Sequence, residues 1–372
     1  MTGLYTHVPF CTKKCHYCNF VIALASPTEN HDLFLGALEQ EARHYEPRVA
    51  DTIFETVYVG GGTPSVLEPE EFEWLFRILR THFKWKTGAE VTCEANPGDI
   101  DLKKARLLKK LGVNRMSLGA QSFHDGTLVK LNRTHRAAEI ESSFRYLRDA
   151  GFSNINLDLI LSLPGESWDH ARHSLERMAK LDPDHVSIYE LTIEDKTVFG
   201  ELHRRGELDV PDEDRQFEIL SNARAFLKEH GYHHYELLNY AKRGHESRHN
   251  LLYWANEDTL GLGPGAYTHL RGSRYRFSKS YHQYLTKIEA KDWSPDEEET
   301  LSNEKKESES FVLALRVTEG AKKDRFSSTL ARLQDEILDM TEKGLLEEVE
   351  GYIKLTARGQ FLAETVFAEL SC

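Results

Sequence analysis

The chain has 372 residues, of which 47 are basic and 60 acidic, so its formal net charge is −13. A chain of this length is too long to fold around one compact core, so we expect two or three domains. The acidic balance argues against nucleic acid as the main partner, because phosphate binding needs a basic surface. No apolar stretch approaches the ~18 residues of a transmembrane helix, and no signal peptide follows Met1. We therefore expect a cytoplasmic protein without a transmembrane segment.

Short β-rich runs alternate with amphipathic stretches up to about residue 190. Strands are predicted at 4–8, 56–59, 90–93, 115–118, 155–159 and 186–189, with helices at 31–45, 69–83, 102–111, 137–150 and 168–180. Such alternation builds a parallel sheet, either doubly wound or a partial barrel. Polar and glycine-rich residues follow all six strands instead of gathering at one switch point. This distribution favours the barrel, in which the carboxyl ends of all strands meet at one mouth.

The rest of the chain predicts two further regions. Residues 211–295 form a connecting region with a helix at 212–230, and the acidic run at 292–309 is a linker. Helices at 309–315, 329–342 and 358–370 and a two-stranded element at 345–355 then resemble a winged helix. From residue 300 onwards the chain holds 10 basic and 14 acidic residues, which favours a structural or protein-contact role over DNA binding. We predict an α/β protein: a partial (β/α)6 TIM-like barrel at 1–210, the connecting region, and an α+β winged-helix-like domain at 296–372.

The most informative motif is C-x3-C-x2-C, formed by Cys11, Cys15 and Cys18 directly after the first strand. Clustered thiolates are soft ligands that favour an iron–sulfur cluster or zinc. A [4Fe–4S] cluster normally takes four cysteines, and the next candidate, Cys93, lies far along the chain. One iron would therefore stay open for an exchangeable ligand.

Other interpretations of the cysteines stay open. A zinc site completed by His7 or His16 is one alternative, whereas disulfides are disfavoured by the odd count of five cysteines. Cys93, inside a predicted strand, is expected to be a small buried hydrophobe. The sequence assigns no role to Cys372.

A glycine run, residues 60–64 (Gly-Gly-Gly-Thr-Pro), follows the second strand. Glycines let the backbone approach a ligand closely and offer it N–H groups. No Gly-Lys-Ser/Thr follows, so the run is not a phosphate-binding Walker loop. An amino acid-like group that chelates the open iron through an amine and a carboxylate would fit beside it.

These motifs, with Tyr17 before the third cysteine, resemble the radical S-adenosylmethionine superfamily. Their order along nearly the whole chain is similar to one branch, the oxygen-independent coproporphyrinogen III oxidases (dehydrogenases) and the HemW haem chaperones. The resemblance implies that Cys11, Cys15 and Cys18 ligate a [4Fe–4S] cluster whose fourth iron holds S-adenosylmethionine. It also implies cofactor contacts from Tyr5, Tyr17, Gly61, Gly62, Thr63, Glu94, Gln121, Arg133 and Asp158.

Three of these residues have distinct expected roles. Glu94 would accept a hydrogen bond from the methionyl ammonium group, Arg133 would pair with the carboxylate, and Asp158 would bind the ribose hydroxyls. The alternatives are a hydrogen-bonded core carboxylate at Asp158 and a solvated helix-start residue at Arg133.

Two features favour the chaperones over the dehydrogenases. The dehydrogenases carry a further cysteine two positions after the third, where this chain has Phe20, and a longer N-terminal extension. The H-N-x-x-Y-W signature of the chaperones is matched by His249, Asn250, Tyr253 and Trp254. Imidazole is a good haem ligand, and the two rings offer flat faces to a porphyrin. The alternative for His249 is a packed core residue.

The resemblance thus implies a haem chaperone, with no catalytic residue assigned, that binds haem and transfers it to an unidentified acceptor protein. The cofactors would be the [4Fe–4S] cluster, S-adenosylmethionine and haem, and a homodimer is left open. The alternatives are an oxygen-independent coproporphyrinogen III dehydrogenase that acts by radical oxidative decarboxylation, or a related radical methyltransferase.

Overall fold

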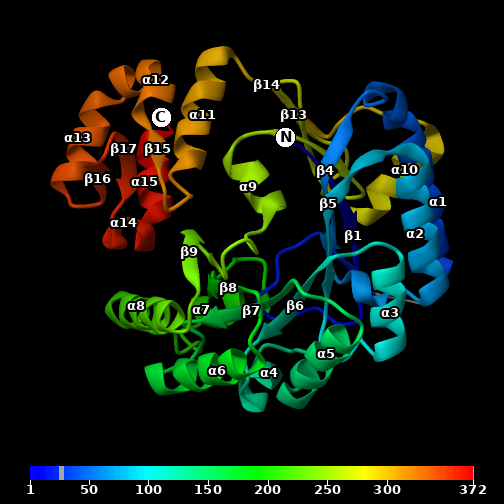
Figure 1. Cartoon of the computed structure of the whole chain (residues 1–372), viewed down its shortest axis with the longest axis horizontal. Coiled ribbons are helices and arrows are strands. Elements are labelled where there is room, and N and C mark those ends of the chain that lie inside the picture. The colour runs from blue at the N-terminus through cyan, green and yellow to red at the C-terminus, as the bar shows by residue number, and fades with distance from the viewer. Residues whose placement is uncertain (25–28, 372) are drawn as a thin grey trace.

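The computed structural model describes residues 1–24 and 29–371, and its main feature is a curved 12-stranded sheet. Neighbouring strands pair in parallel along the order β11-β1-β4-β5-β6-β7-β8, and helices cover the outer face (Figure 1). The predicted partial barrel is confirmed. Its parallel strands are β1 (Thr2–Val8), β4 (Ile53–Gly61), β5 (Lys84–Ala95), β6 (Arg115–Gln121), β7 (Ile155–Leu161), β8 (His185–Glu190) and β11 (Asp258–Leu262).

The covering helices follow from amphipathic sequence and capping residues. The second helix, α2, begins at Pro69 behind a capping box of Glu68 and Glu71, and it buries its apolar face, including Phe72 and Leu75, against the sheet. The helices that follow the barrel strands are α1 (Glu29–Tyr45), α2 (Pro69–His82), α3 (Leu102–Lys110), α4 (Asp125–Lys130), α5 (Ala137–Asp149), α6 (Trp168–Leu181), α7 (Val198–Arg204) and α8 (Glu213–Glu229).

The middle of the chain adds strands to both edges of this sheet. On the β8 edge lie β10 and then β9, whereas β12, β13 and β14 extend the β11 edge. These elements are β9 (His233–Glu236), β10 (Asn239–Ala241), β12 (Tyr267–Leu270), β13 (Ser273–Arg276), α10 (Tyr281–Ala290) and β14 (Glu297–Thr300). A short helix, α9 (Arg248–Trp254), lies on the concave side of the sheet (Figure 1).

The acidic run that was predicted to be a linker is structured, so that prediction is wrong. Glu297–Thr300 is strand β14, and helix α11 (Asn303–Ala314) begins three residues later. Cations on neighbouring elements compensate the negative charge. Glu297 lies 2.7 Å from Arg276 and 2.9 Å from Lys279, and Asp296 lies 2.6 Å from Lys287. A local charge count cannot reveal such cross-strand partners.

The C-terminal part has its own apolar core, which includes Phe311, Leu315 and Val366, and it has the predicted winged-helix-like shape. Two predicted helices are each divided, at Leu333 and at Leu362, where the backbone leaves the helical region. The elements after α11 are β15 (Ala321–Lys322), α12 (Ser327–Arg332), α13 (Gln334–Glu342), β16 (Leu346–Val349), β17 (Tyr352–Leu355), α14 (Ala357–Phe361) and α15 (Ala363–Leu370). Cys372 lies outside the described residues.

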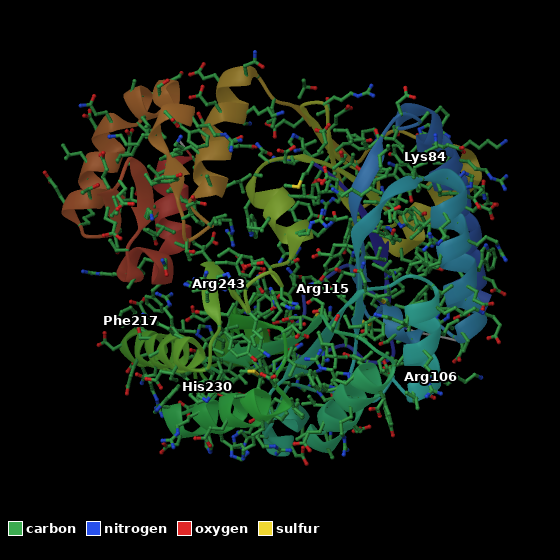
Figure 2. The ribbon with its side chains drawn as sticks, viewed as in Figure 1. Lys84, Arg106, Arg115, Phe217, His230 and Arg243 are labelled. Atoms are coloured by element: carbon green, nitrogen blue, oxygen red, sulfur yellow. The ribbon has the colours of Figure 1, made fainter. Side chains whose placement is uncertain are left out.

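This C-terminal part packs against the rest of the chain through ring contacts and backbone hydrogen bonds. The ring of Phe217 on α8, which Figure 2 labels, meets the ring of Phe361 on α14, and the two ring centroids are 5.3 Å apart. The backbone at Glu236 bridges to Val317, and the amide of Leu237 donates to the carbonyl of Arg316 at 2.9 Å.

Candidate functional site

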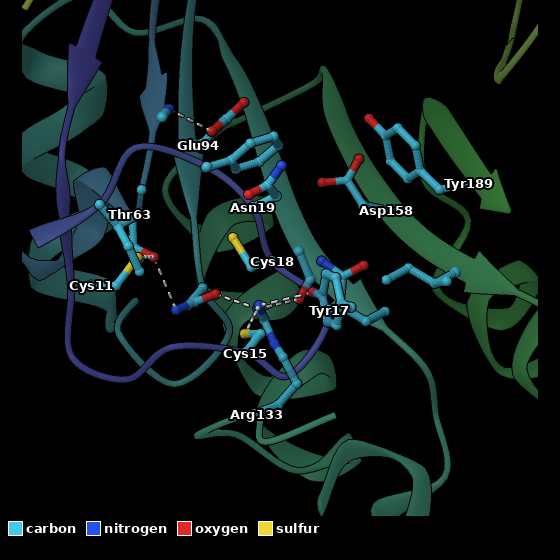
Figure 3. Close-up of a pocket in the computed structure, with 18 of the residues that line it drawn as sticks. Cys11, Cys15, Tyr17, Cys18, Asn19, Thr63, Glu94, Arg133, Asp158 and Tyr189 are labelled. Carbon is cyan, nitrogen blue, oxygen red and sulfur yellow. Dashed lines mark hydrogen bonds between the residues drawn. The ribbon is translucent and has the colours of Figure 1, made fainter. Parts of the chain in front are cut away.

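A cavity of about 410 Å³ opens at the carboxyl ends of the barrel strands, where the sequence places the site. Figure 3 shows Glu94, Asp158 and Tyr189 across this cavity from the cysteine loop. The residues predicted to bind the cluster or S-adenosylmethionine that line it are Cys11, Cys15, Cys18, Tyr17, Gly61, Gly62, Thr63, Glu94, Gln121, Arg133 and Asp158.

The cysteine loop is held in place by backbone hydrogen bonds. Strand β2 (Phe10–Cys11) pairs with β3 (Ala23–Leu24), and the amide of His16 donates to the carbonyl of Leu131 at 3.2 Å. Burial raises the pKa of the Cys11 thiol to about 11, so the thiol is neutral at pH 7 without a metal. Metal binding would therefore release protons from this loop.

The glycine run packs directly against the cysteine loop. Gly61 has a φ of +112°, which favours glycine, and its amide donates to Glu94 Oε2 at 3.1 Å. A Cβ at Gly62 would lie 2.6 Å from the carbonyl oxygen of Phe10 and 3.1 Å from Cys11 Sγ. Only glycine permits this approach. Three thiols beside a backbone cradle of this kind fit a cluster that carries an amino acid-like ligand.

Glu94 is the carboxylate nearest the glycine run. Its Oε1 accepts a hydrogen bond from the hydroxyl of Tyr58 at 2.7 Å. Burial raises the pKa of Glu94 to about 7, and the nearby Asp158 adds to the increase. The ionised form of Glu94 is therefore unfavourable without a cation beside it, and a ligand ammonium group would supply that cation.

Arg133 joins the cysteine loop to two strand ends. Its Nη1 lies 3.4 Å from Cys15 Sγ and 3.5 Å from the hydroxyl of Tyr17, while Nη2 donates to the Gly119 carbonyl at 2.9 Å and to Asn96 Oδ1. Arg133 is therefore a fixed cation at the edge of the cavity, and not a solvated helix-start residue.

Asp158 on β7 and Gln121 at the end of β6 also line the cavity. Asp158 accepts hydrogen bonds from Asn156 Nδ2 at 2.7 Å and from Ser117 Oγ at 3.2 Å. Burial raises the pKa of Asp158. Gln121 has a φ of 65° and ends β6 beside a break in its pairing register with β7. Bulges and backbone strain of this type re-aim side chains next to functional sites.

Tyr5 lies apart from the other predicted cofactor residues. It lines a second cavity of about 440 Å³ together with Phe20, Tyr253 and Tyr267. Its hydroxyl lies 3.0 Å from His7 Nδ1. The two cavities adjoin each other, because Asn19 and Phe20 line both.

His249 is buried on the concave side of the sheet, with 1 % of its surface exposed. Its Nδ1 lies 2.7 Å from Thr56 Oγ1, and its Nε2 lies 3.2 Å from the hydroxyl of Tyr253. Glu90 accepts hydrogen bonds from the backbone amides of Arg248 and His249 and so caps the helix. Burial lowers the pKa of His249 to about 3, so the imidazole is neutral and both nitrogens have partners.

The other residues of the H-N-x-x-Y-W motif differ in what they contact. Tyr253 reaches the second cavity. The ring of Trp254 points toward the C-terminal part, where the guanidinium of Arg316 lies 4.4 Å from its centroid. Asn250 is half-buried, and its backbone amide donates to Ser247 Oγ at 3.4 Å. The motif therefore extends from one cavity to the contact with the C-terminal part.

Sequence reasoning missed some residues of the site. Asn96 joins Arg133 to Thr63, since its Nδ2 lies 3.4 Å from Thr63 Oγ1, and Tyr189 lines the cavity beside Asp158. Both lie at or just after the carboxyl end of a barrel strand, which is the signal that could have found them.

Comparisons with known proteins agree with this geometry. The family model of the radical SAM superfamily matches residues 5–178. The heme chaperone HemW of Bacillus subtilis (strain 168) is 36% identical over 99% of this chain and 98% of its own length. The heme chaperone HemW of Escherichia coli (strain K12) is 31% identical over 98% of this chain and 96% of its own length. The chain belongs to the HemW family of the radical SAM superfamily.

The cofactors and the fold follow from this membership. Radical SAM proteins bind a [4Fe–4S] cluster and S-adenosylmethionine, which are therefore the cofactors of this chain. The structure of coproporphyrinogen III oxidase (HemN) from Escherichia coli, a radical SAM enzyme, matches with a TM-score of 0.87 at 24% identity, over 100% of this chain and 90% of that one. At this identity the likeness shows the fold alone. Within the described part of the chain, no helix has the length and apolar character needed to cross a bilayer.

Proposed function

We propose that the chain is a haem chaperone, which binds haem and transfers it to an acceptor protein. The observation that carries the proposal is the kinship with proteins named heme chaperone HemW over nearly the full chain. The H-N-x-x-Y-W helix supports it, because Tyr253 of this helix lines an aromatic cavity beside the cofactor site. The acceptor protein, a cytoplasmic location and a homodimer are further parts of the proposal. So is the division into a barrel (1–210), a connecting region (211–295) and a C-terminal domain (296–372).

The cluster and its ligand have a defined place in this proposal. Cys11, Cys15 and Cys18 hold the [4Fe–4S] cluster, and S-adenosylmethionine occupies the cavity lined by Glu94 and Arg133. When bound, this pair supplies one-electron chemistry at the barrel mouth. The chain's own residues position it: Glu94 accepts from the ligand ammonium, Arg133 pairs with the carboxylate, and Asp158 accepts from the ribose hydroxyls. The ligand is enclosed by Tyr17, Gly61, Gly62, Thr63 and Gln121. Tyr5 would contact it from the second cavity.

Haem is the cargo of this scaffold. The second cavity offers the rings of Tyr253, Phe20 and Tyr267 as apolar faces, and 68 % of Phe20 is exposed. For His249 to serve as an axial ligand, its Nε2 must exchange the hydroxyl of Tyr253 for the iron. Asn250 and Trp254 complete the proposed haem-binding set on α9, where Trp254 contacts Arg316 of the C-terminal part.

The experiment compares two activities in one anaerobically reconstituted preparation. We expect haem to bind with a Soret band that saturates, and we expect coproporphyrinogen to release no carbon dioxide above a cluster-free control. Turnover of coproporphyrinogen with carbon dioxide release, or a failure to bind haem, would overturn the proposal. Methyl transfer from S-adenosylmethionine to an added acceptor would instead favour the radical methyltransferase.

A further inference from the structure

A third cavity, of about 250 Å³, lies between the barrel and the C-terminal part. It is bounded by the end of β8, by α8 and by α14 and α15, and Phe217 on α8 marks it in Figure 2. Its lining combines two guanidinium groups with aromatic rings, supplied by Arg224, Arg316, Phe217, Phe361, Tyr189 and Tyr240. Cavities at domain boundaries are frequent ligand sites.

The flat faces of the Arg316 guanidinium group pack against aromatic rings, so few of the N–H groups at its edge have polar partners among the described residues. Its guanidinium carbon lies 4.4 Å from the ring centroid of Trp254 and 5.3 Å from that of Phe367. Its ion-pair partner among the described residues is Glu364, 3.7 Å away, and the Glu364 side chain is 89 % exposed. The buried Nε of Arg316 has no hydrogen-bond partner among the residues that the structure describes.

Arg224 supplies the second cation from α8. It lies beside the hydroxyl of Tyr240 and lowers the pKa of that phenol against the increase caused by burial. In the described ranges no carboxylate forms an ion pair with Arg224, and its buried Nε also lacks a hydrogen-bond partner. Both guanidinium groups are half-buried. Arg316 has the exposed Glu364 and the nearby Glu236 as acidic neighbours, whereas Arg224 has no ion-pair partner among the described residues, so a carboxylate bound at the cavity would supply an anion to Arg224 and a further one to Arg316.

The side chains that line the cavity are suited to a carboxylic acid attached to an apolar ring. Guanidinium groups bind carboxylates through paired hydrogen bonds, and the aromatic side chains suit a flat carbon skeleton. The carboxyl groups at the cavity are Glu364, at its exposed rim, and Glu190. Burial raises the pKa of Glu190, which weakens its repulsion of an anion. The volume falls just below the ~300–1,000 Å³ typical of ligand pockets, so the cavity fits the acid edge of a macrocycle and not the whole ring.

We propose that this cavity binds the propionate edge of the haem that the chain carries, with Arg224 and Arg316 as the carboxylate-binding residues. The inference rests on the proposed function. Arg316 links the cavity to the H-N-x-x-Y-W helix through its contact with Trp254. Tyr189, Glu190 and Thr192 line both this cavity and the cofactor cavity, so the bound acid would lie beside the cofactor cavity, on the side across from the cysteine loop (Figure 3).

The test compares haem with its dimethyl ester, in which both propionates are masked. Soret titrations of the full, reconstituted chain measure the two dissociation constants. We expect the wild type to bind haem about tenfold more tightly than the ester, the size of one hydrogen-bonded charge interaction. Arg224→Gln should reduce this ratio several-fold, and Arg316→Lys, which keeps the charge but loses the paired hydrogen bonds, should reduce it less. Arg215→Ala, an exposed position on the same helix, is the matched control and should keep the ratio.

The outcomes separate the inference from the proposed function. The inference is overturned if the chain binds haem and its ester with equal affinity, or if Arg224→Gln and Arg316→Lys leave the ratio of the two dissociation constants unchanged. The chaperone proposal stands in both cases. Absence of haem binding by every form overturns the inference and the chaperone proposal. Added succinate tests whether the cavity binds a free carboxylic acid instead of a haem propionate. We expect succinate to compete only weakly with haem. Displacement of haem by succinate at a concentration similar to that of haem would make the cavity a site for free carboxylic acids and overturn the haem assignment.

Discussion

The guanidinium Nη1 of Arg133 lies 3.4 Å from the sulfur of Cys15, so a residue 118 positions further along the chain contacts the cysteine loop. The same side chain donates to the carbonyl of Gly119 at the end of β6. It thereby connects the cysteine loop with the strand ends that line the cavity at the barrel mouth. The cation also lies where the carboxylate of the ligand is expected.

We predict that Arg133→Ala weakens the binding of S-adenosylmethionine by about tenfold or more, because a charge-assisted hydrogen bond of ~1.5–3 kcal/mol is lost. Isothermal titration calorimetry under anaerobic conditions on the reconstituted protein measures this change. Arg145→Ala, an exposed position on α5, is the control. Unchanged affinity in Arg133→Ala would show that Arg133 only braces the loop.

A second prediction concerns the cluster ligands. Cys11→Ala, Cys15→Ala and Cys18→Ala should each lose most of the iron and acid-labile sulfide after reconstitution, because two thiolates do not retain the cluster. Cys93→Ala should retain it, since Cys93 is fully buried within β5 and does not line the cofactor cavity. Iron and sulfide assays on the four variants check this. One zinc per chain and no sulfide in the wild type would contradict the assignment.

Glu41 on α1 gives a prediction about pH. Its Oε2 accepts hydrogen bonds from the Gly263 amide and the Tyr284 hydroxyl, both at 2.8 Å, and burial raises its pKa from 4.5 to about 7. Between these values the folded chain binds more protons than the unfolded chain. The free energy of unfolding therefore falls as the pH rises through this window.

Glu41→Gln keeps an acceptor and removes the titration. Compared with this variant, the wild type should lose roughly 2–3 kcal/mol of stability between pH 4.5 and pH 8. Urea unfolding at several pH values measures the difference between the two proteins, in which the contributions of other buried acids cancel. A constant difference across the range would contradict the raised pKa.

The fourth prediction concerns the release of His249 for haem binding. Thr56→Val removes the hydrogen bond to Nδ1, which stabilises the buried imidazole by about 1 kcal/mol. A larger fraction of the protein should then be competent to bind haem, so its apparent affinity rises several-fold. His249→Ala should instead abolish most of the binding.

The matched control for this prediction is Thr92→Val on β5, because Thr92 is buried and its hydroxyl has no hydrogen-bond partner within residues 1–24 and 29–371. It should leave the haem affinity unchanged. Soret titrations measure all four proteins. Weaker binding in Thr56→Val would contradict this prediction and indicate that the hydrogen bond to Nδ1 holds His249 in the orientation that haem binding needs.

The sequence predicted the parts of the site that depend on local pattern. Strand–helix alternation placed the cavity at the carboxyl ends of the strands, and the cysteine spacing placed three thiols on one loop. The burial of His249 was one of the alternatives that the sequence left open, but its partner Thr56 was not predictable, because it lies 193 residues away. For the same reason the acidic run appeared to be a linker: the cations that pair with Glu297 lie on a neighbouring strand and in the turn after it. Long-range pairing decides such positions.

The most direct test of the central claim is a Soret titration of the wild-type chain, reconstituted with its cluster under anaerobic conditions. Our account predicts a break at one haem per chain and a bound spectrum that persists through gel filtration. A titration without a break, in protein whose iron and sulfide contents match a complete [4Fe–4S] cluster, would contradict it.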